Sequence, residues 1–512
     1  GMEFGQTTVE DMLVNVNHVR AGYPVISLAR EIGGPADLSS YGIPSTKAGN
    51  IEGGKDVKAI YSWFSEAGYT YKNRYSLSAS VRRDASSSFG RDNRYGTFYS
   101  GGGAWVVSDE KFLQNVKWIS YLKLRANYGT SGSQLGDNFL TRTLYDPRST
   151  YSGAGAATIS VLGNPDLRWE VTKSWNAGVD MEFSKRFTAT VDVYKRSSQD
   201  LLQKVMLPAL SGFPSQWQNA ATVDNKGIEL VVNSQNINSS NFSWSTSFNI
   251  SFNRNQIVNV ANDSLRQGYY PQNSYYLFKG DDINALKAIK YAGVDLQSGK
   301  PRFEKLIFDA KGNKVGVEYV NTMAEVDAAS DSRQFQDIGS SQPRYYGGLT
   351  NNFTYKRFSL SVLITFALKY TIIDNFAASS QVANIDRVNQ LAYTKSQIPW
   401  TTPGQTNATE PKLYYQANTD YFGSSKYMHD ASNASLRNVR LNYDLPQSLT
   451  NRLKLSNFTV YASADNLYTL YNKNIVASGP EGPSVGQAQN FGNSAGPLSI
   501  PKRYVFGLQV TF

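Results

Sequence analysis

The feature of this sequence that most restricts its fold is an alternation of apolar and polar residues, sustained over segments of about ten residues. In residues 242–252 the even positions hold Phe, Trp, Thr, Phe, Ile and Phe, and the odd positions hold Ser, Ser, Ser, Asn and Ser. A β-strand directs successive side chains to opposite faces of its sheet. The segment therefore predicts a strand with one apolar face and one hydrophilic face.

The same alternation recurs in residues 122–129, 174–183, 358–368 and 504–512. Strands of soluble sandwiches are usually about 5–6 residues long, whereas a tilted strand that crosses a membrane needs about 9–11 residues. The hydrophilic faces are rich in Ser, Asn, Thr and Gly, which is unlike a buried core. Length and composition together favour an all-β, antiparallel transmembrane β-barrel over a soluble sheet.

The connections between these segments are alternately short and long. Residues 71–74, 184–186, 236–241 and 355–357 form short turns, and residues 130–168, 198–226, 296–342, 371–433 and 468–499 form long polar loops. Bacterial outer-membrane barrels have short periplasmic turns and long extracellular loops. If Phe512 ends in the periplasm, all the short turns fall on that side, provided that 272–280 and 283–294 are two barrel strands. This arrangement predicts about 15 strands after Ala59, and about 16 with a strand near residues 2–16.

We therefore expect residues 1–58 to form an N-terminal strand and a long loop, and residues 59–512 to form an outer-membrane β-barrel. No run of about 18 apolar residues suggests a transmembrane helix. The mean hydropathy of −0.41 is compatible with a barrel because half of each strand faces a polar lumen. The 33 Tyr and 25 Phe residues suit aromatic girdles at the two membrane interfaces, to which we assign Trp105, Trp118, Trp169, Trp175 and Trp244.

The composition also argues against several functional classes. Cysteine is absent, so disulfides and thiol nucleophiles are excluded. The two histidines, His18 and His429, cannot build a multi-histidine metal site. Asp430 and Ser432 are neighbours of His429 in sequence, which is not evidence for a catalytic triad. Lys and Arg are spread singly along the chain, unlike the clusters of a nucleic-acid binder. We predict no catalytic residues, metal, cofactor or nucleic-acid partner, and no enzymatic activity.

A series of short motifs connects the chain to a known family. They are RRDASSSFG at 82–90, LKLRANYG at 122–129, NPDLRWE at 164–170, NKGIEL at 225–230, DIGSSQPRYYGG at 337–348, SLRNVRLNYDLP at 435–446, ADNLY at 464–468 and PKRYVFGLQVTF at 501–512. Each motif alone is weak evidence, but their order and spacing together are specific. In these motifs the chain resembles the C-terminal barrel part of SusC/RagA-type TonB-dependent outer-membrane transporters of the Bacteroidetes.

The resemblance implies a barrel of about 22 strands in the cell outer membrane, surrounded by lipid. It also implies an accessory domain, a TonB box and a plug, which we expect to lie outside this sequence together with the natural start. The whole transporter would import oligosaccharides or peptides, captured between its loops and a SusD-like surface lipoprotein, with energy from the TonB complex acting through that N-terminal region. A passive porin and a structural or adhesive barrel are the alternatives.

Aromatic residues in the long loops are the candidates for substrate contact. We assign this role to Trp400, Tyr414, Tyr415 and Tyr421, because flat aromatic faces stack on sugar rings and peptide side chains. The alternative is that these rings pack the loops against one another or against a partner lipoprotein.

Overall fold

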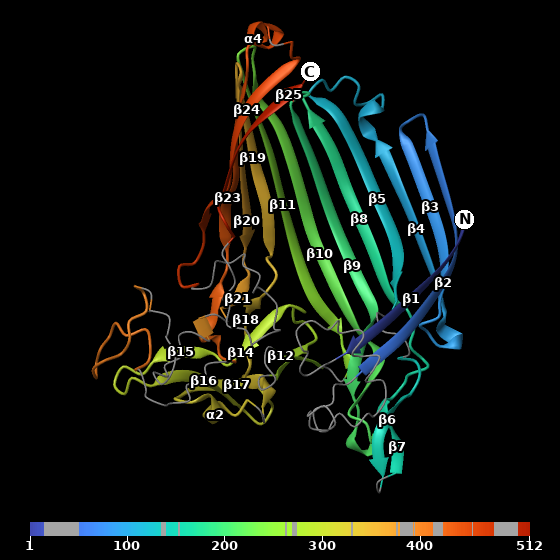
Figure 1. The fold of residues 1–512 in the computed structure, drawn as a ribbon, viewed down its shortest axis with the longest axis vertical. Coiled ribbons are helices and arrows are strands. Elements are labelled where there is room, and N and C mark those ends of the chain that lie inside the picture. Colours follow the sequence, from blue (N-terminus) through green and yellow to red (C-terminus); the bar gives the residue numbers. More distant parts are fainter. Residues whose placement is uncertain are drawn as a thin grey trace, which may run out of the picture.

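The computed structural model describes residues 1–14, 51–134, 140–151, 154–261, 264–268, 274–328, 331–374, 377–378, 393, 395–412, 423–452, 454–475 and 500–511. Its main element is one antiparallel sheet of 14 strands, which curves into an open wall (Figure 1). The strands follow one another around the wall in sequence order. Within the described residues, β1 and β25 form the two ends of this order and do not pair with each other.

The strands of the wall are long enough to cross a membrane, with lengths between 9 residues for β25 and 24 residues for β10. They are β1 (Met2–Val14), β2 (Ile51–Tyr71), β3 (Tyr75–Ser86), β4 (Tyr95–Val106), β5 (Ile119–Ser133), β8 (Glu170–Phe183), β9 (Phe187–Met206), β10 (Ser215–Asn238), β11 (Phe242–Asn259), β19 (Tyr345–Tyr355), β20 (Phe358–Leu368), β23 (Asn433–Asp444), β24 (Asn457–Leu470) and β25 (Arg503–Thr511). Among the described residues, none of the helices has the length and apolar character needed to span a bilayer.

Short and long connections lie at opposite ends of the wall, as the sequence predicts. The long loop predicted at 198–226 was wrong, because β9 continues to Met206 and β10 begins at Ser215, which leaves only residues 207–214 as the connection. The β2–β3, β8–β9, β10–β11 and β19–β20 turns, and the β23–β24 connection with helix α4 (Gln447–Arg452), lie at the upper end in Figure 1. At the β8–β9 turn, Ser184 and Lys185 both have positive φ, of 50° and 55°. Two such residues give the turn the twist that tight hairpins require. The upper end is therefore the periplasmic end.

Five small sheets, which we call the loop sheets, lie at the other end of the wall (Figure 1). They pair β6 (Leu144–Tyr151) with β7 (Ala154–Val161), β12 (Ser264–Gly268) with β13 (Ser274–Phe278), β14 (Ala285–Ala288) with β18 (Gln336–Ser340), β15 (Tyr291–Val294) with β16 (Pro301–Phe308) and β17 (Lys314–Val320), and β21 (Thr371–Ile373) with β22 (Met428–Asp430). Helix α2 (Met323–Val326) packs on β16 and β17.

The assignment of 272–280 and 283–294 to two barrel strands was wrong. These residues contribute β13, β14 and β15 to the loop sheets, and β11 pairs directly with β19 in the wall. The wall consequently has two strands fewer than the sixteen expected. The positions of the short turns are unaffected, because a pair of strands crosses the membrane once in each direction.

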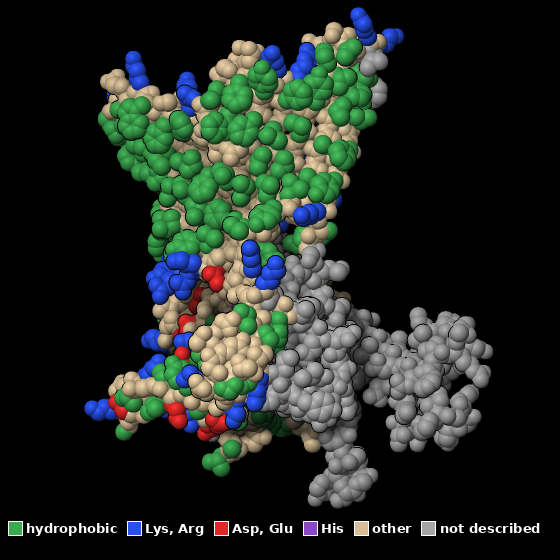
Figure 2. Space-filling view, turned by 90° about the vertical axis from the view of Figure 1, so that its left-hand side faces the viewer, with side chains coloured by type: hydrophobic (Ala, Val, Ile, Leu, Met, Phe, Trp, Pro, Cys, Tyr) green, Lys and Arg blue, Asp and Glu red, His purple; other side chains and the backbone are tan. Residues whose placement is uncertain are grey.

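The apolar face of the strands points outward. On β25, Phe506 and Leu508 are 80% and 64% exposed. Aromatic rings on neighbouring strands stack along this face, such as Trp244 on Phe353 with 5.7 Å between centroids. Figure 2 shows apolar side chains as a broad band over the wall, with Lys and Arg along both of its borders. Such a band is the surface that a barrel presents to lipid.

The predicted tryptophan girdle is confirmed only in part. Trp118 is 60% exposed and stacks on Phe183 near the periplasmic end, and Trp175 is exposed at the other border of the band. Trp105 stacks on Tyr75. The prediction was wrong for Trp169, which is 7% exposed and donates from Nε1 to the carbonyl of Arg94. A buried indole needs such a partner.

The buried protein cores of the described residues lie at the loop end, not behind the apolar face of the wall. One cluster joins β16, β17, α2 and the segment around Tyr427. A second surrounds Phe89, Leu167 and Trp169, a third surrounds Ile257 and Leu277, and a fourth surrounds Ile372. None of them packs a second protein layer on the outward rows of Phe, Leu and Trp. The arrangement excludes a soluble sandwich for this wall.

Candidate functional site

A continuous polar row crosses the inner face of the wall. Strand pairing places Asn127 of β5, Asn176 of β8, Tyr194 of β9, Gly227 of β10 and Asn253 of β11 directly opposite one another in turn. We call these residues the inner row. Their alternating neighbours belong to the apolar outward face, so the side chains of the inner row point to the hydrophilic side. The row aligns only because the register is fixed across all these strands.

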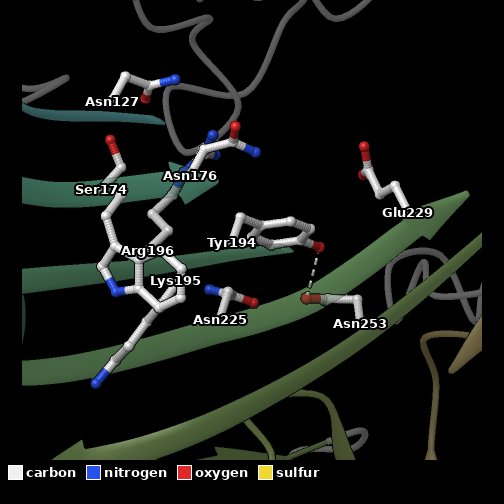
Figure 3. Close-up of a pocket in the computed structure, with 10 residues that line it drawn as sticks. Asn127, Ser174, Asn176, Tyr194, Lys195, Arg196, Asn225, Glu229 and Asn253 are labelled. Carbon is white, nitrogen blue, oxygen red and sulfur yellow. Dashed lines mark hydrogen bonds between the residues drawn. The ribbon is translucent and has the colours of Figure 1, made fainter. Parts of the chain in front are cut away.

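Tyr194 lies flat across β10 because residue 227 is glycine. A Cβ atom at Gly227 would approach the Tyr194 hydroxyl to 2.6 Å. With that space open, the Tyr194 hydroxyl donates a hydrogen bond to Oδ1 of Asn253, at 3.1 Å, on the next strand but one (Figure 3). The glycine therefore lets one ring connect three strands.

A cavity of about 550 Å³ opens on the inner face beside this ring. Its lining residues come from β5, β8, β9, β10 and β11: Asn127, Ser174, Trp175, Asn176, Tyr194, Lys195, Arg196, Asn225, Glu229 and Asn253. Trp175 and Lys195 alternate with the inner row, so their side chains belong to the outward face. In Figure 3, Asn127, Ser174 and Asn176 lie on one side of Tyr194, and Glu229 and Asn253 lie on the other. Amide and hydroxyl groups of this kind can both donate and accept hydrogen bonds with a polar solute.

An ion-pair network supports the inner row from the periplasmic side. The guanidinium of Arg125 contacts Asp192 at 2.6 Å, Asp180 at 3.2 Å and the Asn176 side chain at 3.3 Å. A Cβ atom at Gly178 would lie 2.6 Å from the Arg125 guanidinium carbon. A second glycine thus clears the path for a side chain that spans three strands, and Arg125 fixes the position of Asn176.

Of the predicted substrate-contact residues, Trp400 is the one that the structure describes. Its Nε1 donates to the carbonyl of Leu296 at 2.8 Å, and its ring covers Gly299, where a Cβ atom would lie 2.4 Å from the indole. Trp400 therefore packs against the turn between β15 and β16. Its backbone amide also donates to the carbonyl of Glu410. Tyr414, Tyr415 and Tyr421 lie outside the described residues.

Buried charge lies behind this loop contact. Lys426, in the 3₁₀ turn Ser425–Tyr427, pairs with Glu410, and burial lowers the pKa of the lysine although the carboxylate opposes that shift. Burial also lowers the pKa of His429 on β22 and raises the pKa of Tyr393 to about 12. The Lys426–Glu410 pair joins two loop segments. Among the described residues, no group of three or more acidic or histidine side chains could hold a metal ion.

Comparison with known proteins identifies the family. Residues 33–467 match the family model described as TonB dependent receptor-like, beta-barrel. The chain belongs to this family. It is 29% identical over 499 residues to TonB-dependent receptor P39 of Formosa agariphila, covering 89% of this chain and 46% of that protein. It is also 29% identical over 438 residues to TonB-dependent receptor SusC of Bacteroides thetaiotaomicron, covering 80% and 40%.

Solved structures give the same assignment. The RagAB peptide transporter aligns with a TM-score of 0.75 and 28% identity, over 92% of this chain and 50% of the matched chain. This TonB-dependent receptor barrel thus spans about half the length of its relatives, and it is an outer-membrane β-barrel of the SusC/RagA type. The resemblance seen in the motifs is confirmed.

The cavity residues were not identified from the sequence. All of them except Trp175 and Lys195 occupy an inward, hydrophilic position of an alternating strand, which is the signal that was available. That signal marks dozens of positions equally, and the strand register selects those that meet at the cavity.

Proposed function

We propose that this chain forms the channel wall of a TonB-dependent importer of oligosaccharides or peptides. The observation that carries the proposal is the inner row with its cavity: a fixed array of amides and a hydroxyl, facing the lumen and backed by the Arg125 network. Such groups exchange hydrogen bonds with the amides of a peptide or the hydroxyls of a sugar. The likeness to RagAB, a peptide transporter, supports the peptide alternative.

The proposed importer has two protein partners. A SusD-like lipoprotein covers the loop end, and the TonB complex acts through a plug that accompanies this wall in the full-length protein. Trp400, together with Tyr414, Tyr415 and Tyr421, contributes aromatic surface where the substrate is captured. Two features support a firm loop platform: the buried clusters beneath the loop sheets and the Lys426–Glu410 pair.

Uptake of labelled peptide and labelled oligosaccharide by cells that express the full-length protein tests the proposal. We expect uptake of one class, and its loss when TonB is deleted. Uptake that persists without TonB would identify a passive porin. Equal uptake with and without the protein would leave a structural or adhesive role.

Substitutions in the wall test whether the cavity, and not the rest of the lumen, contributes to uptake. We expect Asn176→Ala/Asn253→Ala to slow uptake about tenfold at unchanged protein level, since two hydrogen-bonding groups at about 0.7 kcal/mol each amount to that factor. Asn352→Ala is the matched control, because Asn352 lies on the inner face of β19 and does not line the cavity. Equal uptake by wild type and the double variant would remove the cavity from the transport path.

A further inference from the structure

Three cationic side chains lie directly opposite one another on the outward face of the wall. Lys195 of β9 pairs with Lys226 of β10, which pairs in turn with Arg254 of β11. We call these three residues the cationic row. They alternate with inner-face residues such as Tyr194 and Asn253, so they share the outward face.

Like charges directly opposite each other in a sheet repel. The structure gives this row one carboxylate, Asp224, whose Oδ2 lies 2.7 Å from Nζ of Lys195. Lys226 and Arg254 are exposed, and neither forms an ion pair with any other residue that the structure describes. Within the described residues, the row therefore keeps an excess of positive charge with a single carboxylate beside it.

Further cations extend this surface. Lys173 of β8 is exposed on the outward face and pairs in register with Ser197, the neighbour of Asp224. Lys369, which follows β20, lies 5.6 Å from the ring centroid of Tyr345. The cations thus continue on both sides of the cationic row.

The cationic row lies at the border of the apolar band. The next outward row toward the periplasm pairs Val193 with Ile228, Ile228 with Phe252 and Phe252 with Tyr345. Two residues along a strand span about 6.6 Å, so the charges lie about that distance from the apolar row, on the side of the loop end. Figure 2 shows Lys and Arg gathered along this lower border of the band. Trp175, opposite Lys195, is an aromatic ring of the kind that settles at the interface.

We propose that the cationic row binds the phosphate groups of a glycolipid headgroup in the outer leaflet of the outer membrane. Phosphate offers several acceptor oxygens: the Arg254 guanidinium can engage two of them, while each lysine acts as a point charge. An anion between the strands also relieves the repulsion along the row. The membrane position selects a lipid as the source of the phosphate, since the neighbouring apolar row on the periplasmic side contacts the acyl chains. The inference rests on the outer-membrane location and not on import.

Native mass spectrometry of the full-length protein, purified from outer membranes in mild detergent, tests this proposal with diphosphorylated lipid A as the probe. We expect Lys226→Gln/Arg254→Gln to retain at least tenfold less lipid A than wild type. The matched control is Lys185→Gln/Lys356→Gln, which removes two exposed cations from periplasmic turns and should retain the wild-type amount. Lipid A treated with phosphatase should bind the wild type as weakly as phosphorylated lipid binds the row variant.

Three results of the lipid A binding measurements would overturn the assignment. They are equal retention by the row variant and wild type, equal loss in the control, and equal binding of dephosphorylated lipid. Displacement of the lipid by millimolar inorganic phosphate would assign the row to free phosphate instead. Resistance of each variant to unfolding in cold detergent confirms that the wall is folded. The single variant Lys226→Gln, at an exposed position, repeats the test, and we expect it to lose less lipid A than the double variant.

Discussion

Nζ of Lys426 lies 2.5 Å from Oε2 of Glu410, and the two side chains are only 5% and 9% exposed. The pair joins the 3₁₀ turn before β22 to the loop segment that carries Trp400, because the Glu410 carbonyl accepts the Trp400 amide. The side chain of Gln397 also donates to the Glu410 carboxylate at 3.3 Å. One buried contact thus determines where a predicted substrate-binding residue is held.

Removal of one charge of this pair should loosen the loop. Glu410→Gln leaves the Lys426 ammonium buried without its carboxylate, which costs about 3–5 kcal/mol. We expect amide hydrogen exchange in residues 396–412 to accelerate by at least a hundredfold. Replacing both charges, as Lys426→Met/Glu410→Leu, should restore most of the protection, because apolar residues can fill the same space. Unchanged exchange in Glu410→Gln would show that the pair does not hold this segment.

The direction of the two faces can be tested at adjacent positions of one strand. Leu230 of β10 pairs with Ile250 and Val191 on the outward face, whereas Val231 pairs with Asn249 and Thr190 on the inner face. Arginine facing lipid near the bilayer midplane costs about 2–4 kcal/mol. We expect Leu230→Arg to reduce the folded fraction of the protein in outer membranes, measured by heat modifiability on gels, and Val231→Arg to reduce it far less. Equal effects would contradict the assignment of faces.

Arg125 should stabilise the inner face of the wall. Arg125→Gln removes the cation that two carboxylates share, and hydrogen bonds to charged groups contribute about 1.5–3 kcal/mol each. We expect a loss of about 2–3 kcal/mol in the free energy of unfolding by urea in lipid vesicles. Arg196→Gln is the control, because Arg196 is exposed on the same strand face as Asp192 and forms no ion pair within the described residues. A similar loss in both variants would point to a general effect of charge.

The loop sheet β21–β22 should lose stability as the pH falls below neutral. Burial holds the pKa of His429 below its ordinary value of 6.5, so the unfolded segment binds a proton at a higher pH than the folded one. Between these two pKa values the unfolded state carries more protons, and the free energy of local unfolding falls as the pH falls. Hydrogen exchange in Thr371–Ile373 and Met428–Asp430, corrected for its intrinsic rate, should be faster at pH 5.5 than at pH 7.5. His429→Gln should remove this difference, and its persistence in the variant would assign the effect to another group.

The strands of the wall could be predicted from the sequence because hydrocarbon and water impose opposite demands on alternate positions. Residues 242–252 show this pattern directly, and they lie within β11. The same logic failed for β13 and β14, where short alternating runs are buried by protein at the loop end instead of by lipid. Alternation indicates that one face of a strand is apolar, but it does not indicate whether lipid or protein covers that face. In the structure β13 and β14 have only 5 and 4 residues, too few to cross a bilayer.

The cavity and the cationic row could not be predicted, because both depend on which residues face each other across strands. Lys195, Lys226 and Arg254 lie far apart in the sequence. The register of β9, β10 and β11 makes them neighbours. Tyr194 and Asn253 meet only because Gly227 lies between them. The hairpin turns fix the strand register jointly. The register is therefore a property of the whole sheet and cannot be read from any single segment.

The buried clusters of the loop end have a consequence for how the molecule responds to its surroundings. Where Phe303 and Val326 are enclosed, protein atoms exclude water by themselves, whereas the outward rows of the wall depend on acyl chains to do so. The two halves are therefore stabilised by different media. Exchange of lipid for detergent weakens the wall first, while extracellular acid and proteases act on the loops, and a single melting temperature would describe neither.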